Sequence, residues 1–305
     1  EIIKTCALRG VKVFITLNTL YKENEIQKVL DFVEKIYSYG AYGLIVQDLG
    51  MVNLIKKYYP NIRISASTQM TVHNSEAIDM LTEMGCSRIV LARELGQKEI
   101  TDICSKKGNT EIEGFIHGAL CVCYSGRCLM SSIIGQRSGN RGRCAQPCRM
   151  EYSLLEDDKT LKSGYLLSPK DISTAEILDK VLATGVDSLK IEGRMKSPEY
   201  VYQVVSTYRK YVDEVMENGT LTIDKEDISN LTQIFNRGGS SSHGYYDTYS
   251  SLNMLSKSPK SSGVEIGVVT GYNPKNKRCS IKLSRPVTAG DGIEIWSKQH
   301  TGTGV

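Results

Sequence analysis

The sequence predicts an α/β fold in which a TIM-like barrel is followed by a small β domain. Short strands rich in Val and Ile alternate with amphipathic helical segments through the first 217 residues. Such alternation is typical of a parallel sheet whose strands are joined by helices. From about residue 218 onward, Gly, Ser and Pro interrupt short apolar runs, which indicates a change of domain.

Six segments of the first 217 residues have the length and composition of strands. They are Val11–Asn18, Gly43–Asp48, Ile62–Ser67, Arg88–Ala92, Ile112–Ile116 and Val186–Ile191. Strands of this kind, separated by helices, form parallel sheets. A complete TIM barrel has eight strands. Because the chain opens within a helical pattern, we expect a TIM-like barrel that lacks its first two β/α units.

Amphipathic helices are predicted between these strands. Asn24–Tyr39 has apolar residues at three- and four-residue spacing, which places them on one face of a helix. Further helices are predicted at Ser75–Met84, Gly96–Cys104, Ala175–Ala183 and Pro198–Glu217. Residues 1–217 are therefore expected to form the barrel domain.

The remainder of the chain is expected to form two parts. Residues 218–262 read as a linker region that contains the Gly- and Ser-rich run Gly238–Ser242. Glu265–Thr270 and Cys279–Leu283 are short alternating strands between Gly and Pro residues. We expect residues 263–305 to be the start of a small β-barrel-like domain, truncated before its sheet closes.

The composition narrows the class of protein. It is 40% hydrophobic and 24% charged, which is typical of a globular protein with an ordinary core. The net charge of +4 does not by itself indicate a nucleic-acid-binding protein. No apolar run approaches the roughly 18–20 residues that cross a bilayer, and the first residues lack a signal-peptide profile. We therefore expect a cytoplasmic protein.

Four of the nine cysteines lie close together in the sequence: Cys121, Cys128, Cys144 and Cys148. Such clustering favours a metal site over disulfides. Thiolate ligands select zinc or an iron–sulfur cluster. Structural zinc sites usually contain two close cysteine pairs, whereas here only Cys144 and Cys148 are close. The spacing favours an iron–sulfur cluster, with zinc as the alternative.

Two other interpretations of the cysteines stay open. Cys123 lies two residues from Cys121, on the same side of an extended backbone, and either thiol is a candidate ligand. We take Cys121. The cysteines would otherwise be free thiols that pack as small apolar side chains.

Five arginines crowd the same segment, which has no acidic residue between Cys121 and Cys148. They are Arg127, Arg137, Arg141, Arg143 and Arg149. Their charges would compensate an anionic cluster, or their planar guanidinium groups would bind carboxylate or phosphate. Arg127, Arg141 and Arg143 are the candidates for substrate binding.

Polar residues follow the predicted strands at the edge where a barrel collects its active site. Gln69 and Arg93 are candidates for substrate binding. Glu192 and Arg194 follow the last strand and are catalytic candidates, or they pair with each other or with Lys190 as a structural network.

His117 is the third catalytic candidate. It lies four residues before Cys121. It is therefore a candidate acid/base catalyst or a candidate hydrogen-bond donor to a metal site. The alternative is a histidine with a purely structural role. No nucleophile elbow, His-Glu-x-x-His motif or phosphate-binding Gly-x4-Gly-Lys loop is present. The sequence therefore contains no familiar hydrolytic motif.

Residues around the cysteines resemble a known family. The stretch Glu113–Ser131, EGFIHGALCVCYSGRCLMS, is similar to the signature of the collagenase-like peptidase family U-32. Similar blocks are found at Asn140–Arg149, Leu167–Asp171, Ser188–Pro198 and Phe235–Gly238 with Gly244-Tyr245. The resemblance covers essentially the whole chain.

This resemblance implies a cofactor and a substrate. Characterised bacterial members hydroxylate RNA pyrimidines or ubiquinone precursors and use a four-iron cluster, which implies a [4Fe-4S] cluster on Cys121, Cys128, Cys144 and Cys148. The chain looks most like the subgroup that contains the 23S rRNA cytidine hydroxylase, with tRNA uridine hydroxylases as near relatives. RNA is thus the implied substrate. Prephenate is implied as a co-substrate whose two carboxylates would suit the arginines.

The expected function is iron–sulfur-dependent hydroxylation of an RNA pyrimidine in rRNA or tRNA. One alternative is the peptidase activity in the family's name, in which the cysteines hold zinc and His117 with Glu192 activates water. The other is a non-catalytic RNA-binding protein with structural zinc.

Overall fold

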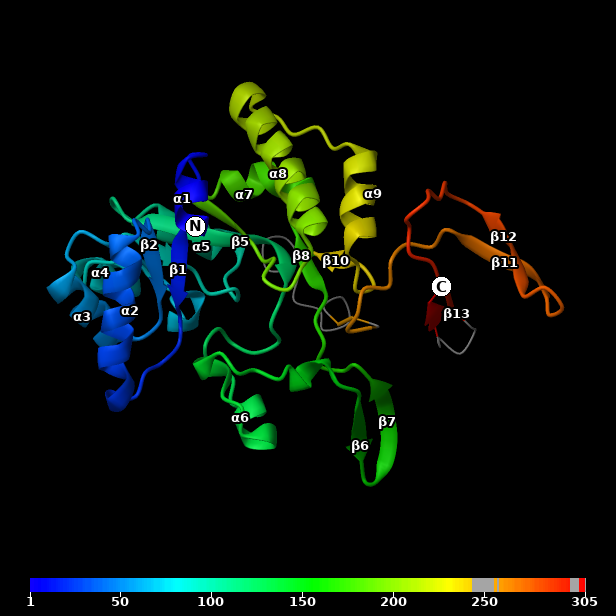
Figure 1. Cartoon of the computed structure of the whole chain (residues 1–305), viewed down its shortest axis with the longest axis horizontal. Helices are drawn as coiled ribbons and strands as arrows, with labels where there is room; N and C mark the ends of the chain where they lie inside the picture. Colours follow the sequence, from blue (N-terminus) through cyan, green and yellow to red (C-terminus); the bar gives the residue numbers. More distant parts are fainter. Residues whose placement is uncertain (243–254, 257, 297–301, 305) are drawn as a thin grey trace. The chain divides into compact units, whose positions relative to one another are not determined.

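The computed structural model describes residues 1–242, 255–256, 258–296 and 302–304 (Figure 1). Gly244 and Tyr245, which belong to one of the family-like blocks, lie outside the described residues. The chain forms two units, Glu1–Ser262 and Gly263–Val305. The candidate site lies in the first unit.

A row of parallel strands is the centre of the first unit. In order, the row contains β1 (Phe14–Leu17), β2 (Gly43–Val46), β3 (Arg63–Ala66), β4 (Arg88–Val90), β5 (Glu111–Ala119) and β9 (Ser188–Ile191). Each strand lies at one of the six predicted segments, so the α/β class with a central parallel sheet is confirmed. The described residues contain no pairing between β1 and β9, so they do not close this row into a barrel.

Two short strands extend the sheet beside β5. β4 ends at Val90, which lies opposite Glu113 of β5. Beyond Glu113, this edge of β5 has no partner in β4. There β8 (Asp171–Ser173) pairs antiparallel with His117–Ala119, and β10 (Ser240–Ser241) pairs parallel with β8. This arrangement brings Asp171 to the carboxyl end of β5, where no strand was predicted.

Helices connect the strands of the row and follow them. The helices of the first unit are α1 (Ile2–Ala7), α2 (Ile26–Ser38), α3 (Leu49–Tyr58), α4 (Ser75–Glu83), α5 (Gln97–Cys104), α6 (Met130–Gly135), α7 (Leu178–Leu182), α8 (Pro198–Asn218) and α9 (Lys225–Ile234). Asp48, Asn74 and Ser197 cap α3, α4 and α8 through side-chain oxygens that accept from the first-turn N–H groups. α9 lies within the stretch expected as a linker, and its Leu231 is part of the core.

The hydrophobic core lies between the sheet and these helices. Leu44, Ile64, Ile89 and Ile112 of the strands are completely buried, as is Ile55 of α3. Full burial of such a side chain stabilises the fold by roughly 1.5–3 kcal/mol. Strands with continuous apolar runs are typical of parallel sheets covered on both faces.

The cysteines lie on a long segment between β5 and β8. It contains α6, the short 3-10 helices η3 (Gly139–Arg141) and η4 (Pro147–Arg149), and a hairpin of β6 (Tyr152–Glu156) and β7 (Lys159–Gly164). In Figure 1 this segment leaves the end of β5 and returns at β8. None of the predicted elements covered this hairpin.

The second unit consists of two antiparallel hairpins. β11 (Gly267–Asn273) pairs with β12 (Arg278–Leu283), and β13 (Glu294–Trp296) pairs with β14 (Gly302–Gly304). The two predicted strands of this region are found in β11 and β12. Within the part of the chain that the structure describes, no helix has both the length and the apolar character of a membrane span.

Candidate functional site

The four predicted cysteine ligands all lie on the segment that follows β5. Cys121 comes two residues after the strand, Cys128 precedes α6, Cys144 follows η3 and Cys148 lies in η4. Cys121 and Cys144 are exposed, whereas Cys128 and Cys148 are partly buried. All four are free thiols.

These thiols share one neighbourhood. Burial raises the pKa of Cys148, and Cys121, Cys144 and Cys128 each raise it further, because a second thiolate nearby disfavours ionisation. A Cβ at Gly139 would lie 3.7 Å from the Cβ of Cys144 and 3.9 Å from the carbonyl oxygen of Cys128. These observations place the four thiols in one region of the segment, and that they hold one metal site together stays a prediction.

The donor set has the chemistry of a thiolate-held group. Four soft sulfur ligands suit an iron–sulfur cluster or zinc. The backbone N–H of Gln146 also donates to the Sγ of Cys144 at 3.3 Å, and hydrogen bonds to sulfur tune such centres. Among the described residues, no three His, Cys, Asp or Glu side chains converge tightly enough to surround a single metal ion.

Cys123 belongs to the same group. Burial raises its pKa, and Cys128 and Cys121 raise it further. The structure therefore keeps both Cys121 and Cys123 near Cys128, and the choice between them stays a prediction.

Buried polar contacts anchor the start of the cysteine segment to the ends of β3 and β4. Ser125 is fully buried, and its N–H and hydroxyl donate to Oε1 of Glu94 at 2.9 and 3.1 Å. Its hydroxyl oxygen accepts from Nε of Arg93 at 3.2 Å, and its carbonyl accepts from the hydroxyl of Thr71 at 2.6 Å. Arg93 thus helps to position the segment in which Cys121 and Cys128 lie.

Gly126 allows a close approach at the same place. Its φ is +72°, and a Cβ added there would lie 2.1 Å from the carbonyl oxygen of Gln69. Only glycine fits that position without a shift of the backbone. Gln69 itself has a buried Oε1 atom without a hydrogen-bond partner among the described residues.

Arg141 anchors the later part of the segment. Its guanidinium donates to both carboxylate oxygens of Glu25, at 2.7 and 2.6 Å, and to the carbonyl of Leu20 at 2.6 Å. This hydrogen bonding lowers the pKa of Glu25 to about 2. The guanidinium group of Arg141 is therefore bound by Glu25 and Leu20, whereas the side chains of Arg127 and Arg143 are exposed.

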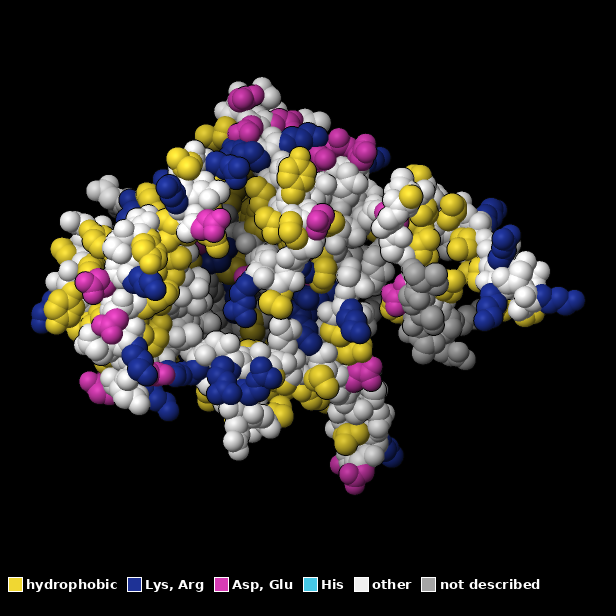
Figure 2. All heavy atoms as spheres, viewed as in Figure 1, with side chains coloured by type: hydrophobic (Ala, Val, Ile, Leu, Met, Phe, Trp, Pro, Cys, Tyr) yellow, Lys and Arg dark blue, Asp and Glu magenta, His cyan; other side chains and the backbone are white. Residues whose placement is uncertain are grey.

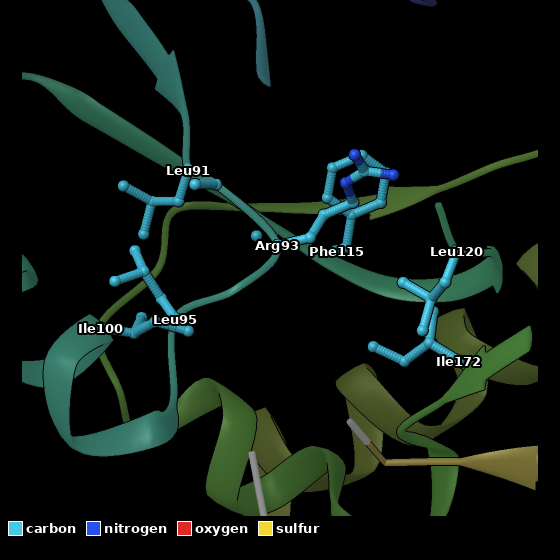
Figure 3. A pocket seen from close by; sticks show the side chains of 9 residues that line it. Leu91, Arg93, Leu95, Ile100, Phe115, Leu120 and Ile172 are labelled. Carbon is cyan, nitrogen blue, oxygen red and sulfur yellow. The ribbon is translucent and has the colours of Figure 1, made fainter. Parts of the chain in front are cut away.

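A small apolar hollow lies beneath Arg93. It is about 300 Å³ including space open to solvent, and it is lined mainly by residues that follow β4 and by β5. Figure 3 shows Leu91, Leu95 and Ile100 on one side of the hollow, Leu120 and Ile172 on the other, and Arg93 with Phe115 between them.

His117 is buried at the end of β5, and its tautomer follows from its surroundings. Its Nδ1 lies 3.3 Å from the hydroxyl of Tyr208. That hydroxyl donates its one hydrogen to the carbonyl of Ile116 at 3.0 Å and accepts from the N–H of Thr174 at 3.0 Å. With its hydrogen on the Ile116 carbonyl, the hydroxyl accepts from His117, an arrangement that favours the tautomer with the hydrogen on Nδ1 and the lone pair on Nε2.

Burial keeps the His117 ring neutral. Burial first, and the Lys196 charge second, lower the pKa of His117 to about 4. Burial also raises the pKa of Tyr208 to about 12, so its hydroxyl stays protonated. At neutral pH, the His117 ring is therefore uncharged, and it bonds to Tyr208 rather than to Glu192.

A second group of polar side chains gathers beside His117, and we call it the buried polar centre. It contains Arg149, Asp171, Lys196, Tyr200 and Arg237. Asp171 Oδ1 pairs with Arg237 at 2.6 Å, and both side chains are largely buried. The ammonium group of Lys196 lies over the rings of Phe235 and Tyr200. Burial, together with Arg237 and Arg149, lowers the pKa of Lys196 to about 8.

Arg149 joins the buried polar centre to the cysteine segment. It follows Cys148 in η4, and its guanidinium donates to the Ser168 hydroxyl at 2.7 Å and the Leu120 carbonyl at 2.9 Å. It also donates to the carbonyl of Pro169. The turn before β8 and the end of β5 are thus held to η4 by one side chain.

Glu192 and Arg194 lie at the carboxyl end of β9. The N–H of Glu192 donates to the His117 carbonyl at 2.9 Å, and a Cβ at Gly118 would lie 2.7 Å from the Glu192 carbonyl oxygen. Lys190 pairs with Glu113 at 3.2 Å rather than with Glu192 or Arg194. Arg194 is exposed.

Asp171, Lys196, Tyr200 and Arg237 are not among the residues predicted for the site. Lys196 has a sequence signal, because it follows the last parallel strand in the same polar run as Glu192 and Arg194. Asp171 and Arg237 lie in two of the family-like blocks, Leu167–Asp171 and Phe235–Gly238, but they join the centre through the pairing of β8 and the packing after α9, which no local pattern predicts.

Comparison with known proteins supplies the family. A sequence model of peptidase family U32 matches residues 1–255. The chain belongs to peptidase family U32. A solved U32 peptidase, Mk0906, is similar at a TM-score of 0.33 and 15% identity over 39% of this chain and 51% of that one, which is too low to add to the description of the fold.

Relatives of this U32 chain have been given several names. The chain is 32% identical to the tRNA hydroxylation protein P1 of Bacillus subtilis, over 95% of this chain and 71% of the relative. It is 34% identical to the 23S rRNA 5-hydroxycytidine synthase of Escherichia coli, over 95% of this chain and 45% of the relative. It is 33% identical to a collagenase of Porphyromonas gingivalis, over 78% of this chain and 60% of the relative.

Proposed function

We propose that this U32 chain carries the site for iron–sulfur-dependent hydroxylation of a pyrimidine in rRNA or tRNA. The observation that carries the proposal is the shared neighbourhood of Cys121, Cys128, Cys144 and Cys148 at the carboxyl ends of the parallel strands. Relatives named as tRNA and rRNA hydroxylation proteins support it. The proposed architecture is a TIM-like barrel to which the six parallel strands belong, and the proposed location is the cytoplasm.

The four cysteines would hold a [4Fe-4S] cluster, with Cys123 as the alternative to Cys121. When bound, the cluster supplies one-electron chemistry that protein side chains lack. The protein supplies the position of that group. Ser125 bonds to Glu94 after β4, and Arg141 bonds to Leu20 after β1 and to Glu25 before α2, so the segment is fixed at two places.

The exposed arginines of the segment are suited to RNA. Arg127 and Arg143 are exposed, and guanidinium groups bind phosphate oxygens of a nucleic-acid backbone. Figure 2 shows Lys and Arg side chains gathered in a recess of the first unit and over the segment that carries α6. Arg141 is assigned to positioning instead, because Glu25 occupies it.

The catalytic roles are assigned to the residues around β5 and β9. Hydroxylation replaces a ring C–H by C–OH, a two-electron oxidation whose oxygen atom and oxidant a co-substrate must supply, and the neutral ring of His117 would accept a hydrogen bond from the substrate. Glu192 and Arg194 would contact the substrate at the same edge, and Gln69 and Arg93 would line the approach from β3 and β4. A small carboxylate such as prephenate is the proposed co-substrate by family analogy.

Peptidase activity is the second candidate because several relatives are named as collagenase or protease. Water activation by a His–Glu pair needs the two side chains within hydrogen-bond reach. The ring of His117 bonds to Tyr208, and the structure gives Glu192 a hydrogen bond with the N–H of Arg194. This geometry favours the hydroxylase proposal over the peptidase.

Anaerobic reconstitution with iron and sulfide tests the cluster. We expect about four irons and four sulfides per chain, as in a [4Fe-4S] cluster, with loss of the brown chromophore in Cys144→Ser. Cys279→Ser is the matched control, because Cys279 is exposed in the second unit. Stoichiometric zinc without sulfide would contradict the cluster. Unchanged hydroxypyrimidine content in both rRNA and tRNA of a deletion strain, measured by mass spectrometry, would contradict the substrate.

A further inference from the structure

The hairpin of β11 and β12 lies in a basic run of the second unit. The chain has no aspartate or glutamate between Glu265 and Asp291. The same stretch contains five cations, which are Lys275, Lys277, Arg278, Lys282 and Arg285. Figure 2 shows Lys and Arg side chains along this hairpin. The hairpin is therefore strongly positive, although the net charge of the whole chain is only +4.

The register of the hairpin separates its side chains onto two faces. Residues directly opposite each other in an antiparallel pair share a face, and successive residues of one strand alternate between the faces. Arg278, Ser280 and Lys282 of β12 therefore lie on one face. Tyr272 is opposite Cys279 and lies on the other face. The face of Arg278 and Lys282, which we call the basic face, thus has no aromatic side chain among its paired residues.

The turn of the hairpin adds two further cations, Lys275 and Lys277, and both are exposed. Asparagine side chains shape this turn. The N–H of Lys275 donates to Oδ1 of Asn273 at 3.0 Å, and the N–H of Arg278 donates to Oδ1 of Asn276 at 3.2 Å. Lys277 has a φ of +53°, a left-handed conformation that glycine adopts with less strain. A cation thus occupies the position of the turn where glycine would be easiest to accommodate.

The cations of the basic face and the turn are not neutralised by the described part of the protein. Four of them form no ion pair with any described residue, namely Lys275, Lys277, Arg278 and Lys282. Like charges held close together repel one another and oppose folding. A bound polyanion would remove this repulsion, so the hairpin is suited to a partner with a regular series of negative charges.

We propose that the basic face and the turn of the β11–β12 hairpin bind the phosphate backbone of an RNA without reading its bases. Lys and Arg side chains bind phosphate oxygens, and such contacts hold a nucleic acid in place but carry no sequence information. Sheets that read single-stranded bases stack them on aromatic side chains, and the basic face has none. The choice of RNA among polyanions rests on the proposed function. The surface itself is separate from the cysteine segment, because it belongs to the second unit.

The side chains of the basic face favour a nucleic-acid backbone over a membrane or an acidic protein. A surface that enters a bilayer interface combines its cations with large apolar side chains, and a protein interface has an apolar core within a polar rim. Ile281 and Leu283 of β12 lie on the face opposite Lys282. Val268 is the one branched apolar side chain among the paired residues of the basic face, which is too little for either partner.

Fluorescence anisotropy of a short labelled RNA duplex with the full chain tests the proposal. The test variant combines Arg278→Gln with Lys282→Gln. Each phosphate contact with a duplex contributes about 0.9 to the slope of log affinity against log salt concentration. Loss of two contacts should therefore reduce this slope by about 1.8, which at about 0.15 M salt is roughly a thirtyfold loss of affinity. Arg278→Lys with Lys282→Arg keeps both charges and should retain the affinity.

Matched controls separate the hairpin from general charge effects. Lys28→Gln with Lys35→Gln removes two exposed cations from α2, and this variant should bind the duplex like the unchanged protein. Tyr272→Ser changes the other face of the hairpin and should also leave binding unchanged. Two duplexes of unrelated sequence should bind with equal affinity, because the proposed contacts are to phosphates. Circular dichroism checks that each variant is folded.

Three binding results would overturn the proposal. They are equal losses of affinity in the hairpin and α2 double variants, a loss in Tyr272→Ser as large as in the hairpin double variant, and hairpin-dependent binding of phosphatidylserine vesicles but not of the duplex. Hydroxylation by the hairpin double variant with an unchanged KM for RNA would also overturn this surface and leave the proposed function in place. RNA binding through the basic face by a chain that hydroxylates no RNA would uphold the surface and contradict only the proposed function.

Discussion

Replacing Tyr208 with Phe removes the hydroxyl that hydrogen-bonds to Nδ1 of His117. In the native protein that hydroxyl donates to the Ile116 carbonyl and accepts from Thr174 and His117. The Ile116 carbonyl keeps two other donors, the N–H of Thr174 at 3.0 Å and its hydroxyl at 3.2 Å. The Thr174 N–H in turn keeps that carbonyl as an acceptor. Only the Nδ1–H of His117 loses its partner.

The expected effect is therefore that of one buried donor left without an acceptor. Such a group destabilises a protein by about 1–3 kcal/mol, and Phe retains the ring packing on His117. We expect Tyr208→Phe to lower the free energy of unfolding in urea by that amount. Nitrogen NMR of the histidine ring should also show a shift toward the Nε2–H tautomer, because nothing then favours a hydrogen on Nδ1.

Tyr202→Phe is the control, since this tyrosine is on the same helix and 76% exposed. Its effect should stay within about 0.5 kcal/mol. If Tyr208→Phe matched this control in stability and left the ring nitrogen signals unchanged, the assignment of Nε2 as the acceptor would be wrong.

Three further predictions concern other parts of the first unit. His117 has a pKa of about 4 in the folded protein against an ordinary 6.5, so between these pH values only the unfolded chain binds a proton. The free energy of unfolding in urea should therefore fall by up to about 3 kcal/mol as the pH drops from 6.5 to 4. His117→Gln should flatten this dependence on pH. Gly126→Ala places a Cβ 2.1 Å from the Gln69 carbonyl oxygen at a φ of +72°, and it should lower the free energy of unfolding by about 2–3 kcal/mol. Gly108→Ala, at a φ of +55° with open space around the Cβ, should lower it less. Equal losses of stability in the two variants would refute the close approach. Burial raises the pKa of Cys86 to about 11, so iodoacetamide at neutral pH should modify the exposed Cys279 and not Cys86. Mass spectrometry measures the labelling, and equal labelling of the two cysteines would contradict this prediction.

The parallel row could be predicted because its signal is local. Each strand is a short run of β-branched residues, and each helix between them has its own apolar stripe, so period and length decide the element. β8 could not be predicted in this way. Asp171–Ser173 is a strand only because β4 ends at Val90 and leaves an edge of β5 to pair with. Closure of a barrel likewise depends on strands at the two ends of the row, which no local pattern specifies.

The candidate site likewise contains features that the local sequence predicts and features that it does not. Four cysteines on one short, glycine-containing segment can reach one another, so their spacing predicts a common neighbourhood. The roles of the arginines were beyond a sequence argument. Arg141 is held by Glu25, more than a hundred residues away in the chain, whereas Arg127 and Arg143 have the same local composition and stay exposed.

Arg149 links the cysteine segment to the buried polar centre, and its geometry gives a last prediction. Its planar fork donates at once to Ser168, Pro169 and Leu120, which belong to two separate segments. A lysine has its three N–H donors on one nitrogen and lacks the two separate nitrogens of the fork, so it does not reproduce this set of contacts. Arg149→Lys should therefore lose at least one hydrogen bond from a charged donor, about 1.5–3 kcal/mol, and loosen η4, where Cys148 lies.

The loosening distinguishes a positioning role from a general loss of stability. Cys148 is half-buried, and burial raises its pKa, so it should react slowly with iodoacetamide while η4 is held against β5. In Arg149→Lys, Cys148 should react several-fold faster under conditions where the protein remains folded, because local opening exposes the thiol. Arg143→Lys changes an exposed arginine of the same segment and should leave that rate unchanged. Equal rates in the two variants would mean that η4 is held by its other contacts, and that the cysteines and the buried polar centre are independent of each other.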